Sequence, residues 1–250
     1  MNNETAVKLK LTQTTASYRR PGSFVVRESY PLPPYSTVIG FVHAACGFTE
    51  YVPMRVSVRG VSAGGVSEPY THYSFNAGGG YEEGRHNVKI CDAEKTYGIM
   101  RGLSHVEMLC DVELCLHIMP ENASMTDAIF DGLRHPMEFP TIGRREDLVR
   151  IDSVKKVRID NRTAEELYDE YIEPFAKYGA YIPLDEANRM GQTGGTRYRL
   201  NKVFVRDEKD GVRKWSERVE AVYVGAGTEF NADESCAVYV DEDGEIVFPV

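Results

Sequence analysis

The stretch that decides the fold is Ser17–Phe48, SYRRPGSFVVRESYPLPPYSTVIGFVHAACGF, in which a basic loop and a proline-rich entry lead into an apolar segment. The Pro-Gly pair is typical of a turn, and the closely spaced prolines favour extended backbone. Thr37–Cys46 is apolar nearly all round, which predicts a buried helix that opens at Tyr35 or Ser36. Ser36 is a good N-cap, and Gly47 is well placed to end the helix in a left-handed conformation.

Alternation of apolar and polar residues predicts strands on either side of this helix. Ala6–Gln13 precedes it and Met54–Gly60 follows it, while the longest alternation covers Val106–Ile118 and another covers Val149–Ile159. Ser124–His135 has the pattern of a second, amphipathic helix with Ser124 as its cap. Residues 1–160 therefore follow the order β-α-β-β-α-β, and we expect an α+β fold with a ferredoxin-like domain.

Between the second and third predicted strands lies a segment of different character, about residues 62–102. It is rich in Gly, Tyr, His and charged residues, and it shows no helical period. We interpret it as a long hairpin inserted into the domain. A floppy surface loop is the alternative, because glycine-rich segments are often flexible.

Residues 161–250 are expected to form a helix followed by a small β-rich subdomain. Thr163–Glu166 reads as a capping box, which opens a helix that we expect to run toward Tyr178. Strands are predicted at Tyr198–Arg206, Val219–Val224, Ala237–Val240 and Glu245–Phe248.

Charge is distributed unevenly along the 250 residues, whose net charge is −9 at pH 7. Residues 1–110 carry 11 Lys and Arg against 9 Asp and Glu, whereas residues 111–250 carry 18 against 29. An acidic C-terminal surface repels free nucleic acid. Any RNA contact is therefore expected on the N-terminal portion or on the basic stretch Arg144–Arg162.

The composition also bears on location and cofactors. No apolar run is long enough to span a bilayer and the N-terminus lacks a secretory pattern, so we expect a cytoplasmic protein with no membrane contact. Five scattered cysteines argue against a disulfide framework. Cys110, Cys115 and His117 could suggest a metal site, but five positions along a strand place the two cysteines on opposite faces. We expect no metal and no cofactor.

The first candidate site combines Arg19 and Arg20 with the helix start at Ser36 and Thr37. A helix N-terminus offers unpaired N–H groups and a partial positive charge, and two arginines on the preceding loop could bind the same anion. Phosphate recognition is the functional interpretation. The alternative is a capped core helix behind a solvated loop, which binds nothing.

Tyr30–Gly40, YPLPPYSTVIG, is the first of three motifs in the N-terminal part, and it is similar to the N-terminal signature of the Cas5 family of RAMP proteins, which are subunits of CRISPR complexes. The others are His105–Leu109, which resembles a strand after a thumb-like hairpin, and Phe139–Leu148, FPTIGRREDL, which resembles a loop before the fourth strand. Together they cover roughly the first 160 residues, and the remainder matches loosely, best with subtype I-B members.

The resemblance implies a role and a set of contacts. Family members lie at one end of a Cascade-type complex, bind the 5′ handle of the guide RNA, and contact a backbone subunit and the large subunit. Target DNA is then reached only through the complex. The thumb would be Ser74–Arg101, with Tyr73, Phe75 and Tyr81 able to stack on unpaired bases. The residues expected to bind RNA are Arg19, Arg20, Ser36, Thr37, Tyr73, Tyr81, Arg85, His86, Lys89, Arg101, Arg144 and Arg145.

Arg144 and Arg145 have a second interpretation. Arginine pairs bidentately with phosphate, but these two could equally form local ion pairs with Glu146 and Asp147.

Two other functions remain open at this point. Some family members cleave repeat RNA without a metal, and His72, Tyr73, His86 and Lys89 form the only loose cluster that could do so here. We expect no enzymatic activity, because no Walker A, His-Glu-x-x-His or Gly-x-Ser-x-Gly pattern occurs and no spacing marks that cluster as catalytic. A ferredoxin-like protein-interaction module, with the acidic C-terminal third as its surface, is the other alternative.

Overall fold

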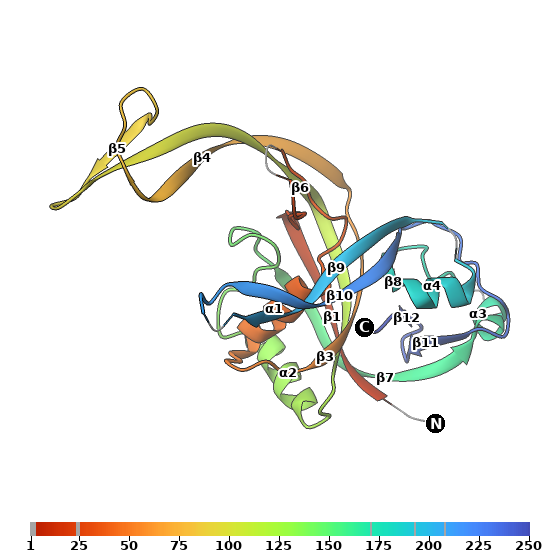
Figure 1. Ribbon diagram of the computed structural model, residues 1–250. Helices are drawn as coiled ribbons and strands as arrows, with labels where there is room; N and C mark the ends of the chain where they lie inside the picture. The colour runs from red at the N-terminus through yellow and green to blue at the C-terminus, as the bar shows by residue number, and fades with distance from the viewer. Residues whose placement is uncertain (1–3, 24–25, 171, 193, 208) are drawn as a thin grey trace.

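The computed structural model describes residues 4–23, 26–170, 172–192, 194–207 and 209–250. These residues form an α+β fold, in which one large and mostly antiparallel sheet carries a few helices (Figure 1).

The centre of the sheet consists of four antiparallel strands in the order β7-β1-β6-β3. Helix α1 lies between β1 and β3 in the chain, and helix α2 lies between β6 and β7. The predicted order of strands and helices is therefore the observed one. A two-residue strand, β2, lies between β1 and α1 and pairs in parallel with β6. The bounds are β1 Glu4–Ala16, β2 Val26–Arg27, α1 Tyr35–Cys46, β3 Met54–Val61, β6 Thr96–Pro120, α2 Met125–Arg134 and β7 Arg150–Thr163.

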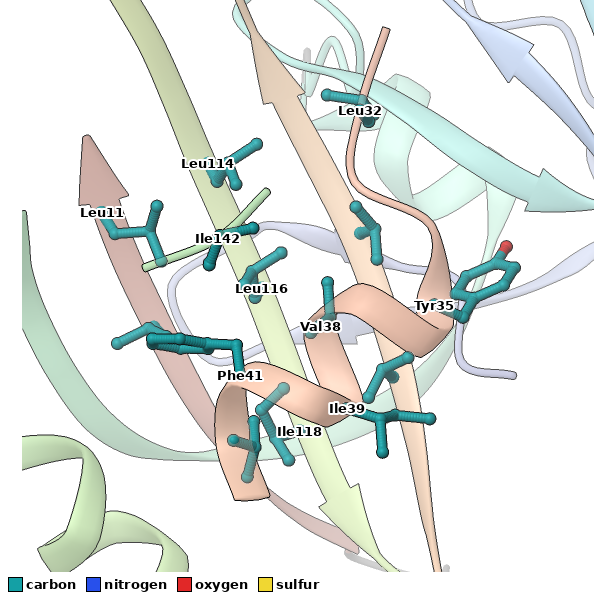
Figure 2. Packing of buried hydrophobic residues seen from close by; sticks show 14 of the residues in the cluster. Leu11, Leu32, Tyr35, Val38, Ile39, Phe41, Leu114, Leu116, Ile118 and Ile142 are labelled. Carbon is teal, nitrogen blue, oxygen red and sulfur yellow. The ribbon is translucent and has the colours of Figure 1, made fainter. Parts of the chain in front are cut away.

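Helix α1 packs on the sheet and forms the main core. Figure 2 shows Val38 and Phe41 of α1 against Leu116 and Ile118 of β6, and the cluster also holds Leu11 of β1. These side chains are at most 5% exposed. Burying an aliphatic or aromatic side chain stabilises a fold by roughly 1.5–3 kcal/mol each, so this face fixes the position of the helix.

The ends of α1 correct one prediction and confirm another. Ser36 is not the N-cap: Pro34 occupies that position, and its carbonyl accepts the N–H groups of Thr37 and Val38 at 2.9 and 3.2 Å. The reason is that extended Pro34 already carries the chain into the helix, which places Ser36 inside the first turn. Gly47 has φ 68° and donates to the Ala44 carbonyl, as expected for a left-handed C-cap.

The other helix starts were partly predictable. Ser124 precedes α2, but it makes no capping bond, because its hydroxyl donates to Asn122 Oδ1 instead. The capping box of Thr163 and Glu166 is present. The helix that it opens, α3 (Ala164–Asp169), ends far short of Tyr178, so the predicted length was wrong. Pro174 lacks the N–H that a continuing helix needs there.

The inserted segment forms a hydrogen-bonded hairpin that leaves the body (Figure 1). We call residues 64–110 the arm. It consists of β4 (Gly64–Gly80), β5 (Val88–Cys91) and the first part of β6. Asp111 has φ 48° where β6 passes from pairing with β3 to pairing with β4, a conformation that Asp adopts more readily than most residues. This irregular position turns the strand from the body into the arm.

The C-terminal strands extend the same sheet at both edges. Strands β8, β10 and β9 continue from β3, while β11 and β12 continue from β7. The predicted strands of this part are present, whereas β8 and the short helix α4 were not predicted. The bounds are β8 Gly179–Pro183, α4 Leu184–Met190, β9 Thr196–Arg206, β10 Arg213–Val224, β11 Ala237–Asp241 and β12 Ile246–Val247.

A buried ionic cluster joins the C-terminal segment to the sheet face opposite α1. Lys8 Nζ lies 2.6 Å from Asp241 Oδ2, and His117 Nε2 lies 2.9 Å from the same oxygen. Beside them, the guanidinium of Arg59 pairs with Glu245 at 2.6 Å. Lys8, Arg59 and His117 are at most 2% exposed. The last residue pairs with β3, because Val56 and Val250 exchange both backbone hydrogen bonds.

The cluster shifts the pKa values of its members. Burial opposes the charged form of Asp241, but hydrogen bonds from His117 and Lys8 outweigh it and lower the pKa of the carboxyl well below its usual range. Burial also opposes the charge of Lys8, and hydrogen bonds to Asp241 and Asp243 raise its pKa nonetheless. Burial lowers the pKa of His117, although Asp241 acts in the opposite direction.

Replacing the central carboxylate should therefore destabilise the fold. Asp241→Asn leaves buried Lys8 without its closest counter-charge, and we expect a loss of about 3 kcal/mol in urea unfolding. The folded pKa of Asp241 lies below the unfolded value of about 3.9. Its contribution is thus complete above that pH and is lost as the pH falls further. The matched control, Asp243→Asn, should cost less than about 1 kcal/mol, because that side chain is partly solvated. Equal unfolding midpoints for wild type and Asp241→Asn would contradict the assignment.

Candidate functional site

The four residues of the first predicted site come together in space. Arg19, Arg20, Ser36 and Thr37 line one depression of about 300 Å³. The structure adds Tyr30, next to the prolines, and two residues from the C-terminal third, Asn201 and Trp215. We call this the arginine–tryptophan depression.

Arg20 is held in position by its neighbours. Its guanidinium lies 2.8 Å from Glu28, and its backbone N–H donates to the Glu28 carbonyl, also at 2.8 Å. The same guanidinium lies 5.9 Å from the ring centroid of Tyr30 and 5.8 Å from that of Tyr198. Arg19, by contrast, is exposed, and among the described residues its side chain makes one long hydrogen bond, to the Ser23 carbonyl at 3.4 Å. One arginine is fixed and the other can move toward a ligand.

The start of α1 contributes less than its sequence suggested. The N–H of Thr37 donates to Pro34, so it is not available to an anion. No side chain caps the helix, which leaves the N–H groups of Tyr35 and Ser36 as donors at this end, since the first turn has no intrahelical acceptor. The side chains of Ser36 and Thr37 are half-buried beside the two arginines.

Trp215 is one of the lining residues that sequence reasoning missed. It lies on β10, opposite Phe204 of β9, and the two rings meet edge to face at 6.0 Å. A signal existed, since it is the only tryptophan of the chain and stands in a strand among charged residues. Nothing local connects it to Arg19, because only the sheet topology brings β10 to the front of α1 (Figure 1).

The predicted residues of the arm divide into two groups. At the tip, Tyr81, Arg85, His86 and Lys89 are engaged with their own neighbours. His86 is 8% exposed and its Nδ1 accepts the N–H of Glu82 at 2.9 Å, while Arg85 pairs with Glu82 at 3.1 Å. The ammonium of Lys89 lies 5.1 Å from the ring centroid of Tyr81.

The second group is open to solvent. Tyr73 and Arg101 face each other across β4 and β6, and both are exposed. Phe75 and Leu103 lie on the same face of the arm and are 72% and 70% exposed. This open face, Tyr73, Phe75, Arg101 and Leu103, combines an aromatic and aliphatic surface with one cation.

The cluster considered for RNA cleavage is not assembled in one place. His72 and Tyr73 are consecutive in β4, so they lie on opposite faces of the arm. His72 covers Gly102 and His86 covers Gly98, and both rings fill the space that a side chain at those glycines would need.

Arg144 and Arg145 have different surroundings. The guanidinium of Arg144 bonds to the buried Asp147 at 2.6 Å and pairs with Glu146 at 3.2 Å. Asp147 Oδ2 also accepts the backbone N–H of Ser17 at 3.0 Å. The hydrogen bond to Asp147 outweighs the opposing effect of burial and raises the pKa of Arg144. Arg144 thus forms the local ion pair that was the alternative, whereas Arg145 is exposed.

Gly143 and Asp147 explain how the loop Phe139–Leu148 is fixed. Gly143 has φ 111°, and a Cβ there would lie 2.7 Å from Asp147 Oδ2. Gln13 adds two hydrogen bonds, from its side-chain amide to the carbonyls of Ile142 and Asp147 at 2.9 and 3.0 Å. The loop is therefore bound to the end of β1, next to the loop that carries Arg19 and Arg20.

Within the described ranges, no three His, Cys, Asp or Glu side chains gather as metal ligands would. None of the helices described is both long and apolar enough to cross a membrane.

Comparison with known protein families shows which family the chain belongs to. The sequence model of the family described as CRISPR-associated protein (Cas_Cas5) matches residues 6–222. The chain belongs to the Cas5 family. The matched range includes the three motifs of the N-terminal part as well as most of the C-terminal strands, and it confirms the resemblance. No curated protein matches the chain.

A solved structure agrees with this Cas5 assignment at the level of the fold. It is named "CRISPR RNA-guided surveillance complex" and has a TM-score of 0.53 and 19% identity, over 90% of this chain and 95% of that chain. One named "Crystal structure of Cas protein" has a TM-score of 0.42 and 15% identity, covering 91% and 95%. A CRISPR protein from Archaeoglobus fulgidus has a TM-score of 0.44 and 10% identity, covering 97% of both chains.

Replacing Arg144 and replacing Arg145 should lower the free energy of unfolding by different amounts. Arg144→Ala removes the charged hydrogen bonds of buried Asp147, and we expect a loss of about 2 kcal/mol in urea unfolding. Arg145→Ala is the matched control and should stay within about 0.5 kcal/mol of wild type. If both variants unfolded at the wild-type midpoint, the structural role of Arg144 would be refuted.

Proposed function

We propose that this Cas5 protein is a non-catalytic subunit of a Cascade-type CRISPR interference complex and binds the 5′ handle of the guide RNA. The observation that carries the proposal is the arginine–tryptophan depression, where two arginines and an indole converge beside a helix start. Arginine suits phosphate and aromatic rings suit unstacked bases, which are the two groups that single-stranded RNA presents.

The depression and the arm are joined, which supports one continuous RNA surface. The loop that carries Arg19 and Arg20 returns along β6 through β2, where Val26 pairs with His105. The N–H of Ser29 donates to Glu107 of the arm at 3.2 Å. The open face of the arm then continues the surface with Tyr73, Phe75 and Arg101. In this proposal the arm is the thumb of the family, and Arg145 is the nearby exposed cation.

The remaining elements have places in the same proposal. The four central strands with α1 and α2, residues 1–160, act as the ferredoxin-like RAMP core, and residues 161–250 form its C-terminal subdomain. A backbone subunit and the large subunit bind elsewhere on the surface. The assembly works in the cytoplasm and meets target DNA only through the complex.

A repeat-cleaving activity is not favoured by the geometry. General acid–base cleavage needs its groups within reach of one phosphate, whereas His72 and Tyr73 lie on opposite faces and His86 is buried. Incubation of the protein with labelled repeat RNA in EDTA decides between the two functions, since a discrete cut would overturn the non-catalytic proposal.

Loss of both arginines of the depression should weaken RNA binding. Arg19→Ala combined with Arg20→Ala removes two phosphate partners, and we expect at least about a tenfold loss of affinity for repeat-derived RNA. The slope of log affinity against log salt should become shallower by roughly 0.7 for each phosphate that the variant no longer neutralises. The control is Arg134→Ala with Lys177→Ala, two exposed cations that lie outside the depression, the arm and the stretch Arg144–Arg162.

Titration of fluorescently labelled RNA measures the affinities, and thermal melting confirms that both double variants stay folded. The same variants are then assembled with the backbone subunit, and the co-purified guide RNA is quantified. A wild-type complex that retains no guide RNA would remove the proposed function, and equal affinities of the two double variants would remove the role of Arg19 and Arg20.

The open face of the arm should contribute through stacking. Tyr73→Ala is expected to weaken RNA binding by about 1–3 kcal/mol, which is the usual contribution of an aromatic ring under a base. Tyr73→Phe keeps the ring and should bind nearly as wild type. A loss that is equal in both variants would point to the hydroxyl and exclude stacking.

A further inference from the structure

The β9–β10 hairpin brings an aromatic wall to the arginine–tryptophan depression. The hairpin is the part of the acidic C-terminal third that reaches across α1 to the loop of Arg19 and Arg20 (Figure 1). Along Thr196–Val224 it is locally basic, so it differs in charge from the rest of that third. Its basic residues are Arg197, Arg199, Lys202, Arg206, Lys209, Arg213, Lys214 and Arg218.

The indole of Trp215 is held in a defined orientation. Phe204 contacts it edge to face at 6.0 Å, and the guanidinium of Arg213 lies 4.6 Å from the ring centroid of Phe204. Trp215 is only half-buried, so part of its ring is left to line the depression. A fixed and partly open indole at a concave site suits a flat aromatic partner.

The polar groups around the indole are complementary to a nucleotide. Asn201 lines the depression, and its Oδ1 accepts from Arg218 Nε at 3.1 Å, which leaves its amide NH₂ as a donor. Arg19 and Arg20 line the same depression. An indole, an amide donor and two cations therefore surround one space.

The volume of the depression limits the size of the ligand. Its volume of about 300 Å³ is at the lower end of the range for small-molecule sites, about 300–1,000 Å³. That volume suits one extruded nucleotide rather than a helix or strand of another protein. The cations favour an anionic ligand over an apolar side chain.

We propose that Trp215 is the stacking wall of a single-nucleotide pocket, in which one unpaired RNA base lies on the indole and its phosphate meets Arg19 and Arg20. This inference rests on the proposed RNA-binding function and deepens it, because it assigns one base position to the C-terminal hairpin. Asn201 supplies a hydrogen bond to an acceptor on the edge of that base.

The single tryptophan of the chain makes the pocket directly measurable. The full-length protein is titrated with single-stranded RNA of the repeat sequence, while tryptophan emission and the anisotropy of labelled RNA are followed in parallel. We expect quenching of the emission with the same midpoint as the anisotropy change. Trp215→Ala should lower the affinity roughly five- to 150-fold, and Trp215→Phe should retain most of it. Phe139→Ala, at a 91% exposed aromatic residue outside the depression, is the control and should bind as wild type.

A set of RNAs with one abasic nucleotide at successive positions identifies the partner base. In wild type, one position should lose both the quenching and most of the affinity gained from Trp215. In Trp215→Ala, the same abasic RNA should bind no worse than the intact RNA. This comparison depends on the RNA, so it remains informative even where the variant is less stable.

The outcomes separate the pocket from the wider function. RNA binding that depends on Arg19 and Arg20 but leaves the emission unchanged, with Trp215→Ala equal to wild type, overturns the pocket and leaves the proposed function intact. Quenching by the backbone subunit without RNA shows that the hairpin binds protein, and it also overturns the pocket. Absence of guide RNA from the wild-type complex overturns the proposed function itself.

Discussion

Backbone pairing along β6 is the interaction on which the rest of the structure depends. In the body this strand lies between β1 and β3, and in the arm the same strand carries β2, β4 and β5. The irregular position at Asp111 separates the two parts, so one continuous strand links the core to the projecting hairpin. The start of the arm is therefore fixed relative to the core. The strand β6 that sets the register of the arm continues into the body, where it is buried between β1 and β3.

The position of the candidate site follows from this arrangement. The chain leaves β1, forms the loop of Arg19 and Arg20, touches β6 again through β2, and then enters α1. Packing of α1 on β6 fixes its first turn beside that loop. Asp147 fixes the loop from the other side through its bond to the N–H of Ser17. The loop of Arg19 and Arg20, strand β2 and the start of α1 are thus held together by residues that do not line the depression.

Local features of the sequence predicted most of the fold. Alternation in Val106–Ile118, the capping box at Thr163 and the glycine after Cys46 each depend on neighbours within a few residues, and each was found. Ser36 failed as a cap because Pro34 had already set the helix entry. Strand β8 and helix α4 are short, and their burial comes from distant strands, so no local pattern marked them.

The candidate site divides in the same way. Arg19, Arg20, Ser36 and Thr37 are close in sequence and were found together. Trp215 and Asn201 are brought next to these residues only by the strand order of the sheet, which cannot be read from local sequence patterns. For Arg144, the ion pair depends on the burial of Asp147, which is a property of the folded chain, and its contact with RNA stays a prediction.

The buried cluster around Asp241 restricts where RNA can lie. Many RNA-binding domains with a four-stranded sheet receive bases on the open face of that sheet. Here that face is covered, since residues 241–250 cross it and remove Lys8, Arg59 and His117 from solvent. The cations that would attract a nucleic acid on an open sheet are neutralised by the chain itself. In the proposed function, the surfaces left for RNA are therefore the helix side and the arm, and the RNA strand binds at the edge of the sheet rather than across its face.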